Sequence, residues 1–178
     1  MNKAAIRKEM RARLQMLSTQ QIREASESIT RQVLASEEFL QAHTVMAYIS
    51  MPMEPETGEL IRQAGALGKQ VLLPRCKEPP CMEALPWRGN EWLQPGPFGI
   101  PEPVREEGML AIPEPDLILV PCLAATKKGA RLGHGAGYYD WYLRRHSGKK
   151  ICLCFQIQLL ETIPVTSTDV MMDQVFWA

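Results

Sequence analysis

Residues 116–143 read DLILVPCLAATKKGARLGHGAGYYDWYL, and this segment changes character twice along its length. It begins with a nearly unbroken apolar run, as expected for a β-strand that is covered on both faces. A glycine-rich loop follows, and the segment ends in YYDWYL, which has the composition of a helix start. Strands that alternate with helices along a chain indicate a mostly parallel sheet with helices on its faces.

The glycine-rich loop is the first candidate functional feature. Gly133, Gly135 and Gly137 are evenly spaced between the strand and the helix. Glycines allow backbone N–H groups to approach a ligand, and a helix start adds unpaired N–H groups and a positive dipole end. Together these features predict an anion cradle that suits phosphates. The upstream cations Lys127, Lys128 and Arg131 would add donors.

The glycine pattern alone leaves a second interpretation open. Its spacing matches neither the dinucleotide-binding fingerprint nor the Walker A motif. A flexible turn between a strand and a helix explains the three glycines equally well.

Asp140 makes the phosphate interpretation more specific. It lies in the first turn of the predicted helix, where a carboxylate beside a triphosphate would be repelled unless a cation stood between them. Mg²⁺ is the usual solution, since one or two carboxylates and phosphate oxygens hold it. The C-terminal TSTDVMMDQV supplies further acids, Asp169 and Asp173. The alternative is that Asp140 is only a favourable first-turn charge.

The N-terminal part of the chain predicts two helices. Asn2 can cap the first, in which Ile6, Met10, Leu14 and Leu17 recur at helical spacing. The pair Ser18 and Gln21 forms a capping-box pattern that opens a second helix through Val33.

The rest of the chain predicts alternating strands and helices. Thr57 can cap a helix over residues 58–67, which Gly68 would close. A proline- and tryptophan-rich stretch from Cys76 to Pro115 predicts loops around one short strand. The predicted strands are residues 44–50, 69–74, 82–87, 116–124, 150–156 and 174–178. We therefore expect one domain over residues 1–178, an α/β three-layer Rossmann-like fold with a mostly parallel central sheet flanked by helices.

Charge and composition exclude several classes of protein. Twenty basic residues balance twenty acidic ones, which disfavours nucleic acid as the main partner. No apolar run is long enough to span a bilayer, and the charged N-terminus does not resemble a signal peptide. The five cysteines lack a C-x-x-C pair, so buried thiols in a reducing compartment are expected. We expect a monomer in the cytoplasm, with no nucleic acid or membrane partner.

The segment VPCLAATKKGARLGHGAGYYDWYL resembles the signature of the 5-formyltetrahydrofolate cyclo-ligase family, which joins V-P-x-L-A to G-x-R-L-G-x-G-x-G-Y-Y-D. The resemblance extends over nearly the whole chain. The K-x-x-x-R element at Lys3 and Arg7, then YISMPMEPETGELI, VLLPR, FGIPEP and PVTSTDVMMD follow in the family's order.

The resemblance implies a role for each matching residue. Lys3, Arg7 and Arg131 would contact ATP phosphates and act as the catalytic cations; Lys3 and Arg7 are four apart and would share one helix face. Without the resemblance, they would be a solvated basic face with Lys8 and Arg11. The implied ATP loop is Arg131, Leu132, Gly133, His134, Gly135, Ala136, Gly137, Tyr138 and Tyr139. The implied folate-binding residues are Glu54, His134, Gly135, Ala136, Gly137 and Tyr138. The implied Mg²⁺ ligands are Asp140 and Asp169, with Asp173 as a less certain neighbour.

The chain departs from the family pattern at one point. Where the family usually has L-A-F-D after the strand, this chain has Leu123, Ala124, Ala125 and Thr126. The missing aromatic ring and carboxylate fall next to the ATP loop, so loop packing or affinity for Mg²⁺ or ATP could differ.

The reaction that the resemblance implies belongs to one-carbon metabolism. 5-Formyltetrahydrofolate becomes 5,10-methenyltetrahydrofolate while ATP becomes ADP and phosphate. Transfer of the γ-phosphoryl group to the formyl oxygen makes the carbon electrophilic, and N10 then attacks it. Such chemistry needs positioning and charge neutralisation rather than a protein nucleophile.

Three other functions stay open from the sequence. A non-catalytic folate- or nucleotide-binding paralogue would explain the change at Ala125 and Thr126. A sugar-phosphate isomerase or transferase could use a similar scaffold without ATP, since fold does not determine function. The amphipathic N-terminal helix could instead serve a membrane surface or a partner. The roles of Trp87, Trp92 and Phe98 also stay open; Phe98 could stack on a flat ring or pack in the core.

Overall fold

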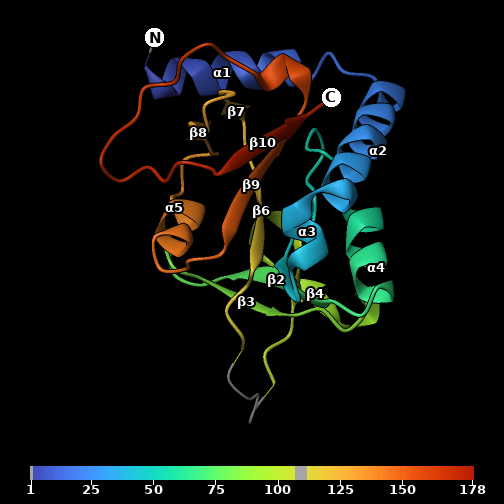
Figure 1. Ribbon diagram of the computed structural model, residues 1–178. Helices are drawn as coiled ribbons and strands as arrows, with labels where there is room; N and C mark the ends of the chain where they lie inside the picture. Colours follow the sequence, from blue (N-terminus) through green and yellow to red (C-terminus); the bar gives the residue numbers. More distant parts are fainter. Residues whose placement is uncertain (1, 107–111) are drawn as a thin grey trace.

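The computed structural model describes residues 2–106 and 112–178 (Figure 1). Its helices are α1 (Lys3–Leu14), α2 (Thr19–Ala35), α3 (Glu37–Gln41), α4 (Gly58–Ala66) and α5 (Tyr138–Leu143). Its strands are β1 (Thr44–Met46), β2 (Gln70–Cys76), β3 (Met82–Pro86), β4 (Leu93–Pro95), β5 (Pro101–Pro103), β6 (Leu117–Pro121), β7 (Ala124–Ala125), β8 (Arg131–Leu132), β9 (Lys149–Cys154) and β10 (Gln174–Trp177).

The central sheet has six strands in the order β10-β9-β6-β1-β2-β3. Every neighbouring pair is parallel except β2 and β3, which form an antiparallel hairpin. The predicted mostly parallel sheet is therefore confirmed. From β1 the chain moves to β2 on one side, and it later returns to β6 on the other side. The carboxyl ends of β1 and β6 thus form a topological switch point, where open α/β sheets bind ligands.

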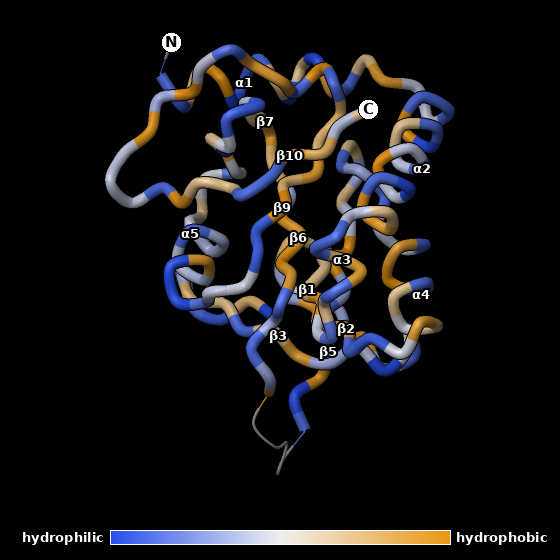
Figure 2. Tube along the Cα trace, viewed as in Figure 1, coloured by the Kyte–Doolittle hydropathy of each residue, from blue (hydrophilic) through white to orange (hydrophobic). Residues whose placement is uncertain are grey.

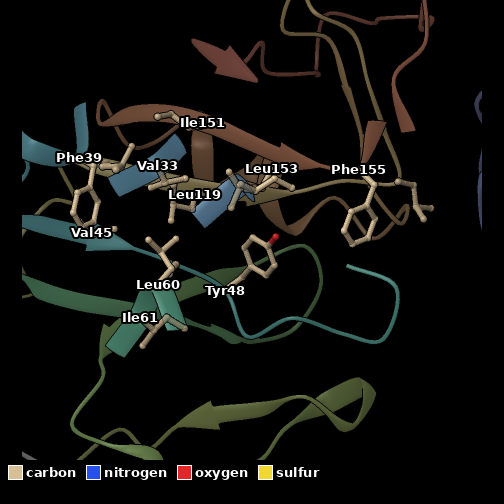
Figure 3. Packing of buried hydrophobic residues seen from close by; sticks show 14 of the residues in the cluster. Val33, Phe39, Val45, Tyr48, Leu60, Ile61, Leu119, Ile151, Leu153 and Phe155 are labelled. Carbon is tan, nitrogen blue, oxygen red and sulfur yellow. The ribbon is translucent and has the colours of Figure 1, made fainter. Parts of the chain in front are cut away.

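The two faces of the sheet are covered unequally. Side chains of α1 to α4 pack on one face with alternate strand residues such as Val45, Leu119 and Leu153. Figure 3 shows this packing around Val33, Phe39 and Leu60. The other strand residues, among them Ile118 and Cys152, form a second cluster with Tyr142 and Leu143 of α5. The apolar residues along β6 and β1, visible in Figure 2, are buried by both clusters, which confirms the sequence prediction for β6.

Most of the predicted helix ends are confirmed. The Asn2 side chain accepts a hydrogen bond from the Ala5 N–H, and Ser18 and Gln21 form the predicted capping box of α2. The prediction that the Thr57 side chain caps α4 was wrong. Thr57 precedes the helix, but its hydroxyl donates to the Tyr48 carbonyl and is unavailable to the helix.

The stretch from Cys76 to Pro115 holds more structure than predicted. Beside the expected strand β3, it contains β4 and β5, which pair with each other. Residues 107–111 of this stretch lie outside the described residues. The prediction of buried thiols is confirmed for Cys122, Cys152 and Cys154, whereas Cys76 and Cys81 are partly exposed.

Within the described parts of the chain, no helix combines the length and the apolar character needed to cross a bilayer.

Candidate active site

A cavity of about 580 Å³ opens at the carboxyl ends of β1 and β6. The segment after β1 contributes Tyr48 and Glu54, β6 contributes its last residue Pro121, and the glycine-rich loop closes one side. Apart from Lys127, Lys128 and Asp173, every residue to which the sequence gave a binding role lines it. These are Lys3, Arg7, Glu54, Arg131, Leu132, Gly133, His134, Gly135, Ala136, Gly137, Tyr138, Tyr139, Asp140 and Asp169.

The glycine-rich loop presents unused backbone donors to the cavity. The N–H groups of residues 133–137 make no hydrogen bond to any acceptor in the described part of the chain. Gly135 and Gly137 have φ values of +116° and +80°, which side chains with a Cβ rarely adopt. A run of unpaired amides is costly unless water or a ligand satisfies it. This geometry suits an anion with several oxygens.

The helix that follows the loop is short. α5 has six residues, with Gly137 as its N-cap and no side-chain cap. A single turn and a half carries little macrodipole. The predicted contribution of the helix dipole is therefore minor, and the loop amides with the neighbouring cations are the main source of positive potential.

Arg131 lies beneath the loop and is almost fully buried. Its guanidinium donates to the Pro121 carbonyl oxygen at 3.1 Å and to the Asp140 carboxylate at 3.2 Å. Its own Nε and the hydroxyl oxygen of Tyr139 are buried and have no hydrogen-bond partner among the described residues. Burial raises the pKa of Tyr139, so its hydroxyl remains a donor at neutral pH. Buried polar groups without protein partners at a cavity wall are available to a ligand.

Helix α1 brings a row of cations to the same cavity. Lys3, Arg7 and Arg11 are spaced four residues apart, so they lie on one face of the helix. Lys3 Nζ contacts both carboxylate oxygens of Asp169, at 2.6 and 2.5 Å. Arg7 Nε donates to the Gly133 carbonyl oxygen at 2.9 Å. The alternative interpretation, a solvated basic face, is therefore not supported, because Lys3, Arg7 and Arg11 line the cavity.

The two upstream lysines do not share this role. Lys127 and Lys128 are exposed and lie outside the cavity, and the Lys127 ammonium sits over the Trp177 ring at 5.0 Å. The prediction that they add cationic donors to the loop was wrong, because the turn between β7 and β8 directs them away from it.

The two acids predicted as metal ligands are each paired with a cation. Asp140 accepts from Arg131 and from the Val170 N–H, and Asp169 accepts from Lys3 and Thr166. Burial raises the pKa of Asp169, but the hydrogen bonds from Lys3 and Thr166 outweigh it, and the net pKa lies below its usual value. Asp169 is therefore a carboxylate at neutral pH.

The donor set fits Mg²⁺ shared with phosphate oxygens rather than a cage built from protein alone. Among residues 2–106 and 112–178, no group of three or more histidine, cysteine or acidic side chains could hold a metal ion. Mg²⁺ commonly uses one or two carboxylates plus substrate phosphates, which is the pair that Asp140 and Asp169 supply. Asp173 is not part of the cavity; it accepts a hydrogen bond from the Lys150 N–H instead.

Glu54 lies in the cavity wall opposite the glycine-rich loop. It is buried, and both of its carboxylate oxygens have protein partners. Oε2 accepts from the Met51 N–H at 2.8 Å, and Oε1 lies 3.2 Å from His134 Nε2. The predicted folate-binding acid and the predicted loop histidine are therefore in direct contact.

Several cavity residues were given no role by the sequence. They are Arg11, Tyr48, Ile49, Met51, Pro74, Cys76, Met82, Ile100, Glu102 and Pro121. Glu102 is the most unexpected of them, because it is an acid that is only 5% exposed. Glu102 belongs to the FGIPEP segment of the family pattern, and the packing of β5 against β2 brings it to the cavity. Phe98 also lines the cavity with 70% of its surface exposed, so core packing is excluded for it.

The departure from the family pattern lies outside the cavity. Ala125 is fully buried in the second core cluster. Thr126 is buried too, and its hydroxyl accepts a hydrogen bond from the Ala130 N–H at 3.1 Å. An aspartate oxygen could accept the same bond, so threonine preserves the turn that precedes Arg131.

Fold and site together define an α/β protein whose switch-point cavity combines unpaired backbone amides, a row of cations and two carboxylates. Comparisons with known proteins identify the family to which the chain is similar. The model of the 5-formyltetrahydrofolate cyclo-ligase family matches residues 1–178. The chain belongs to this family.

Individual relatives agree over nearly the whole length. A mouse (Mus musculus) 5-formyltetrahydrofolate cyclo-ligase is 32% identical, and the match covers 98% of this chain and 93% of the relative. The solved structure of the 5,10-methenyltetrahydrofolate synthetase from Aquifex aeolicus superposes with a TM-score of 0.86 at 30% identity, covering 99% of this chain and 90% of the other. The corresponding synthetase from Mycoplasma pneumoniae, 20% identical, has the same fold with a TM-score of 0.76 and 98% coverage of both chains.

Proposed function

We propose that this chain is an ATP-dependent 5-formyltetrahydrofolate cyclo-ligase that forms 5,10-methenyltetrahydrofolate. The formyl oxygen takes the γ-phosphoryl group as the bond to the β-phosphate oxygen breaks, and ADP leaves. N10 then attacks the activated carbon, the carbon–oxygen bond breaks, and inorganic phosphate departs with that oxygen. N10 loses its proton as the ring closes.

The observation that carries this proposal is the meeting of unpaired amides and cations at one cavity wall. Residues 133–137 offer backbone N–H groups without protein acceptors, and Lys3 and Arg7 from the start of the chain lie beside them. Amides of this kind, together with cations, bind phosphates. Phosphoryl transfer depends mainly on such positioning and charge neutralisation.

Each cation has a distinct place in this scheme. The Nε of Arg7 is tied to the Gly133 carbonyl, which leaves its terminal amino groups for phosphate oxygens. Arg131 is held by Pro121 and Asp140, so it adds positive charge beneath the loop while it orients Asp140. Lys3 is paired with Asp169, and a phosphate oxygen would replace that carboxylate as its partner.

We propose Asp140 and Asp169 as the ligands of Mg²⁺. When bound with ATP, the ion would neutralise phosphate charge and help fix the reacting group in line. Without ligand, Lys3 and Arg131 supply the neutralising charge for these two acids. Nucleotide and metal are therefore expected to bind cooperatively, since the phosphates offer new partners to the cations that the metal displaces.

The folate is assigned to the part of the cavity near Glu54. This carboxylate is positioned by Met51 and contacts His134, so an N–H group of the folate would share or replace the histidine. The residues from His134 to Tyr138 would lie along the same ligand. No nucleophilic cysteine is needed, and burial together with the Glu102 carboxylate raises the pKa of Cys76, the cysteine in the cavity wall, to about 12.

The other functions left open by the sequence find less support. The non-catalytic paralogue rested on Ala125 and Thr126, which do not line the cavity. A sugar-phosphate enzyme does not fit the family to which the chain belongs. A role for α1 at a membrane surface does not account for Lys3 and Arg7 lining a cavity. The single domain, the monomer and the cytoplasmic location stay predictions from the sequence.

The test is a spectrophotometric assay of the purified protein with 5-formyltetrahydrofolate and Mg²⁺. Absorbance of the methenyl product should rise only when ATP is present, with one ADP formed for each product molecule. Product formation without ATP, or binding of both ligands without turnover, would refute the proposal.

A further inference from the structure

Glu102 is a second glutamate in the cavity wall, distant from the phosphate-binding loop in sequence and unassigned in the proposed mechanism. It lies on β5 and its side chain packs over Gly96, where an added Cβ would come within 2.5 Å of the Glu102 carboxyl carbon. The carboxylate oxygen Oε1 accepts from the Cys76 N–H at 3.0 Å. The backbone on both sides therefore holds this side chain in one position.

The charge of Glu102 is poorly compensated by the protein. Among the described residues, no lysine, arginine or histidine forms an ion pair with it, and its one strong donor is the Cys76 amide. Glu83, on the neighbouring strand β3, is an acid that does have cationic partners. Arg75, Lys77 and Arg105 all lie within 4 Å of the Glu83 carboxylate. Burying a carboxylate that has no cationic partner is costly, so a buried acid without an ion pair at a cavity wall calls for further donors from a ligand.

The surroundings of Glu102 define the kind of donor. The neighbouring wall residues Met82, Phe98 and Ile100 are apolar or aromatic, and Phe98 is exposed to the cavity. Phe98 also has a left-handed backbone (φ +64°), a conformation that costs energy for a phenylalanine and is enriched at functional sites. An apolar wall with one carboxylate suits a flat ring that carries N–H groups along one edge.

We propose that Glu102 is a substrate-positioning residue that binds the amino-pyrimidinone edge of the reduced folate, through its 2-amino and N3–H groups. This inference rests on the proposed function, because the substrate must be a folate. Glu102 is the freer of the two buried glutamates, because each Glu54 oxygen already has a protein partner, whereas the one hydrogen bond described for Glu102 comes from the Cys76 N–H. Glu54 then contacts N–H groups nearer the reacting centre, and Glu102 holds the far end of the ring.

The first test uses the unmodified protein and two ligands. One is 5-formyltetrahydrofolate, and the other is its analogue with the 2-amino group replaced by a methyl group. Hydrogen bonds to charged groups are among the strongest single contacts, so the analogue should bind about 10- to 100-fold more weakly in calorimetry without ATP. Equal affinity for the two ligands would overturn the proposal without any mutant.

The second test locates the contact at Glu102. The variant Glu102→Gln has nearly the same shape but turns a donor toward the ligand, so KM for 5-formyltetrahydrofolate should rise about 10- to 100-fold while KM for ATP stays unchanged. Glu102→Gln should also lose the preference for the parent ligand over its methyl analogue, whereas Glu54→Gln should keep it. Glu59→Gln on the exposed face of α4 is the matched control and should behave as wild type.

The outcomes separate this inference from the proposed function. If the wild-type protein forms no methenyl product with ATP, the proposed function fails and Glu102 is not at issue. If the wild type turns over and Glu102→Gln keeps both its KM and its discrimination, the inference alone is wrong. If Glu102→Gln weakens the binding of 5-formyltetrahydrofolate and of ATP equally, Glu102 has a structural role, and this result would also contradict the inference.

Discussion

At the scale of single residues, two of the acids in the site form ion pairs with cations of the same cavity. Asp140 faces Arg131 and Asp169 faces Lys3, while Glu54 contacts His134. The two ion pairs neutralise part of the charge in the cavity. Ligand binding then exchanges partners instead of exposing bare charges, which keeps the cost of forming the empty site low.

Asp140→Asn tests the first of these pairs. An amide in place of the carboxylate removes a negative charge that we assign to Mg²⁺, so ATP turnover should fall by about 100-fold or more. The matched control is Asp173→Asn, an aspartate that accepts a backbone hydrogen bond outside the cavity. Steady-state kinetics of both variants test this assignment, and near-normal turnover in Asp140→Asn would exclude Asp140 as a metal ligand.

Lys3→Met tests the second pair through its pH dependence. The folded pKa of Asp169 is lowered, so the stability contributed by the pair is fully present above the ordinary carboxyl pKa of about 3.9 and is lost as pH falls through the lower folded value. The pair is partly exposed, so Lys3→Met should lower the free energy of unfolding by about 1 kcal/mol at most at pH 7.

Urea unfolding at pH 7 and at pH 3 measures this effect. The difference between wild type and Lys3→Met should be smaller at pH 3. The control is Lys8→Met, which changes an exposed lysine one position beyond Arg7 on the same helix. A difference that is independent of pH would show that Lys3 stabilises the chain by packing alone.

At the scale of elements, the junction between the glycine-rich loop and α5 tests whether this loop binds phosphate. Gly137 has φ +80° and Gly68, at the end of α4, has φ +78°. Alanine at either position should cost about 1 kcal/mol in unfolding free energy, because a Cβ disfavours this conformation. Only Gly137→Ala should also raise KM for ATP, since Gly137 lines the cavity and Gly68 does not. Equal kinetics for the two variants would argue against a phosphate-binding loop.

The elements also show what local patterns can and cannot predict. Asn2 and the Ser18–Gln21 box were predictable because a cap depends on residues within one turn. Thr57 was predicted wrongly because its hydroxyl is used by Tyr48, nine positions earlier, which no local pattern reveals. The strand pair β4 and β5 was missed for a related reason, since each strand has only three residues and is rich in proline.

At the scale of the whole molecule, the site joins parts of the chain that are distant in sequence. Lys3 and Asp169 are separated by 166 positions and yet form a hydrogen-bonded ion pair. The sequence motifs predicted which of these residues belong to the site, because family patterns record ligand contacts. They could not predict Glu102 or Arg11, whose places depend on how β5 and α1 pack on the sheet.

Coupled binding of the nucleotide and Mg²⁺ predicts an increase in Tm. A non-hydrolysable ATP analogue with Mg²⁺, at about 100 times its Kd, should stabilise the protein by about 2.7 kcal/mol, which is roughly 5–10 °C in Tm. Mg²⁺ alone should have little effect, because Lys3 and Arg131 already neutralise its ligands. Differential scanning fluorimetry with and without a chelator measures this, and a shift that persists in the chelator would contradict the metal assignment.

The most direct measurement is a crystal structure with a non-hydrolysable ATP analogue and Mg²⁺. We predict that the triphosphate lies against the backbone amides of residues 133–137, with Arg7 beside it and the ion between the phosphates and Asp140. A nucleotide bound elsewhere, with these amides still facing solvent, would contradict the account.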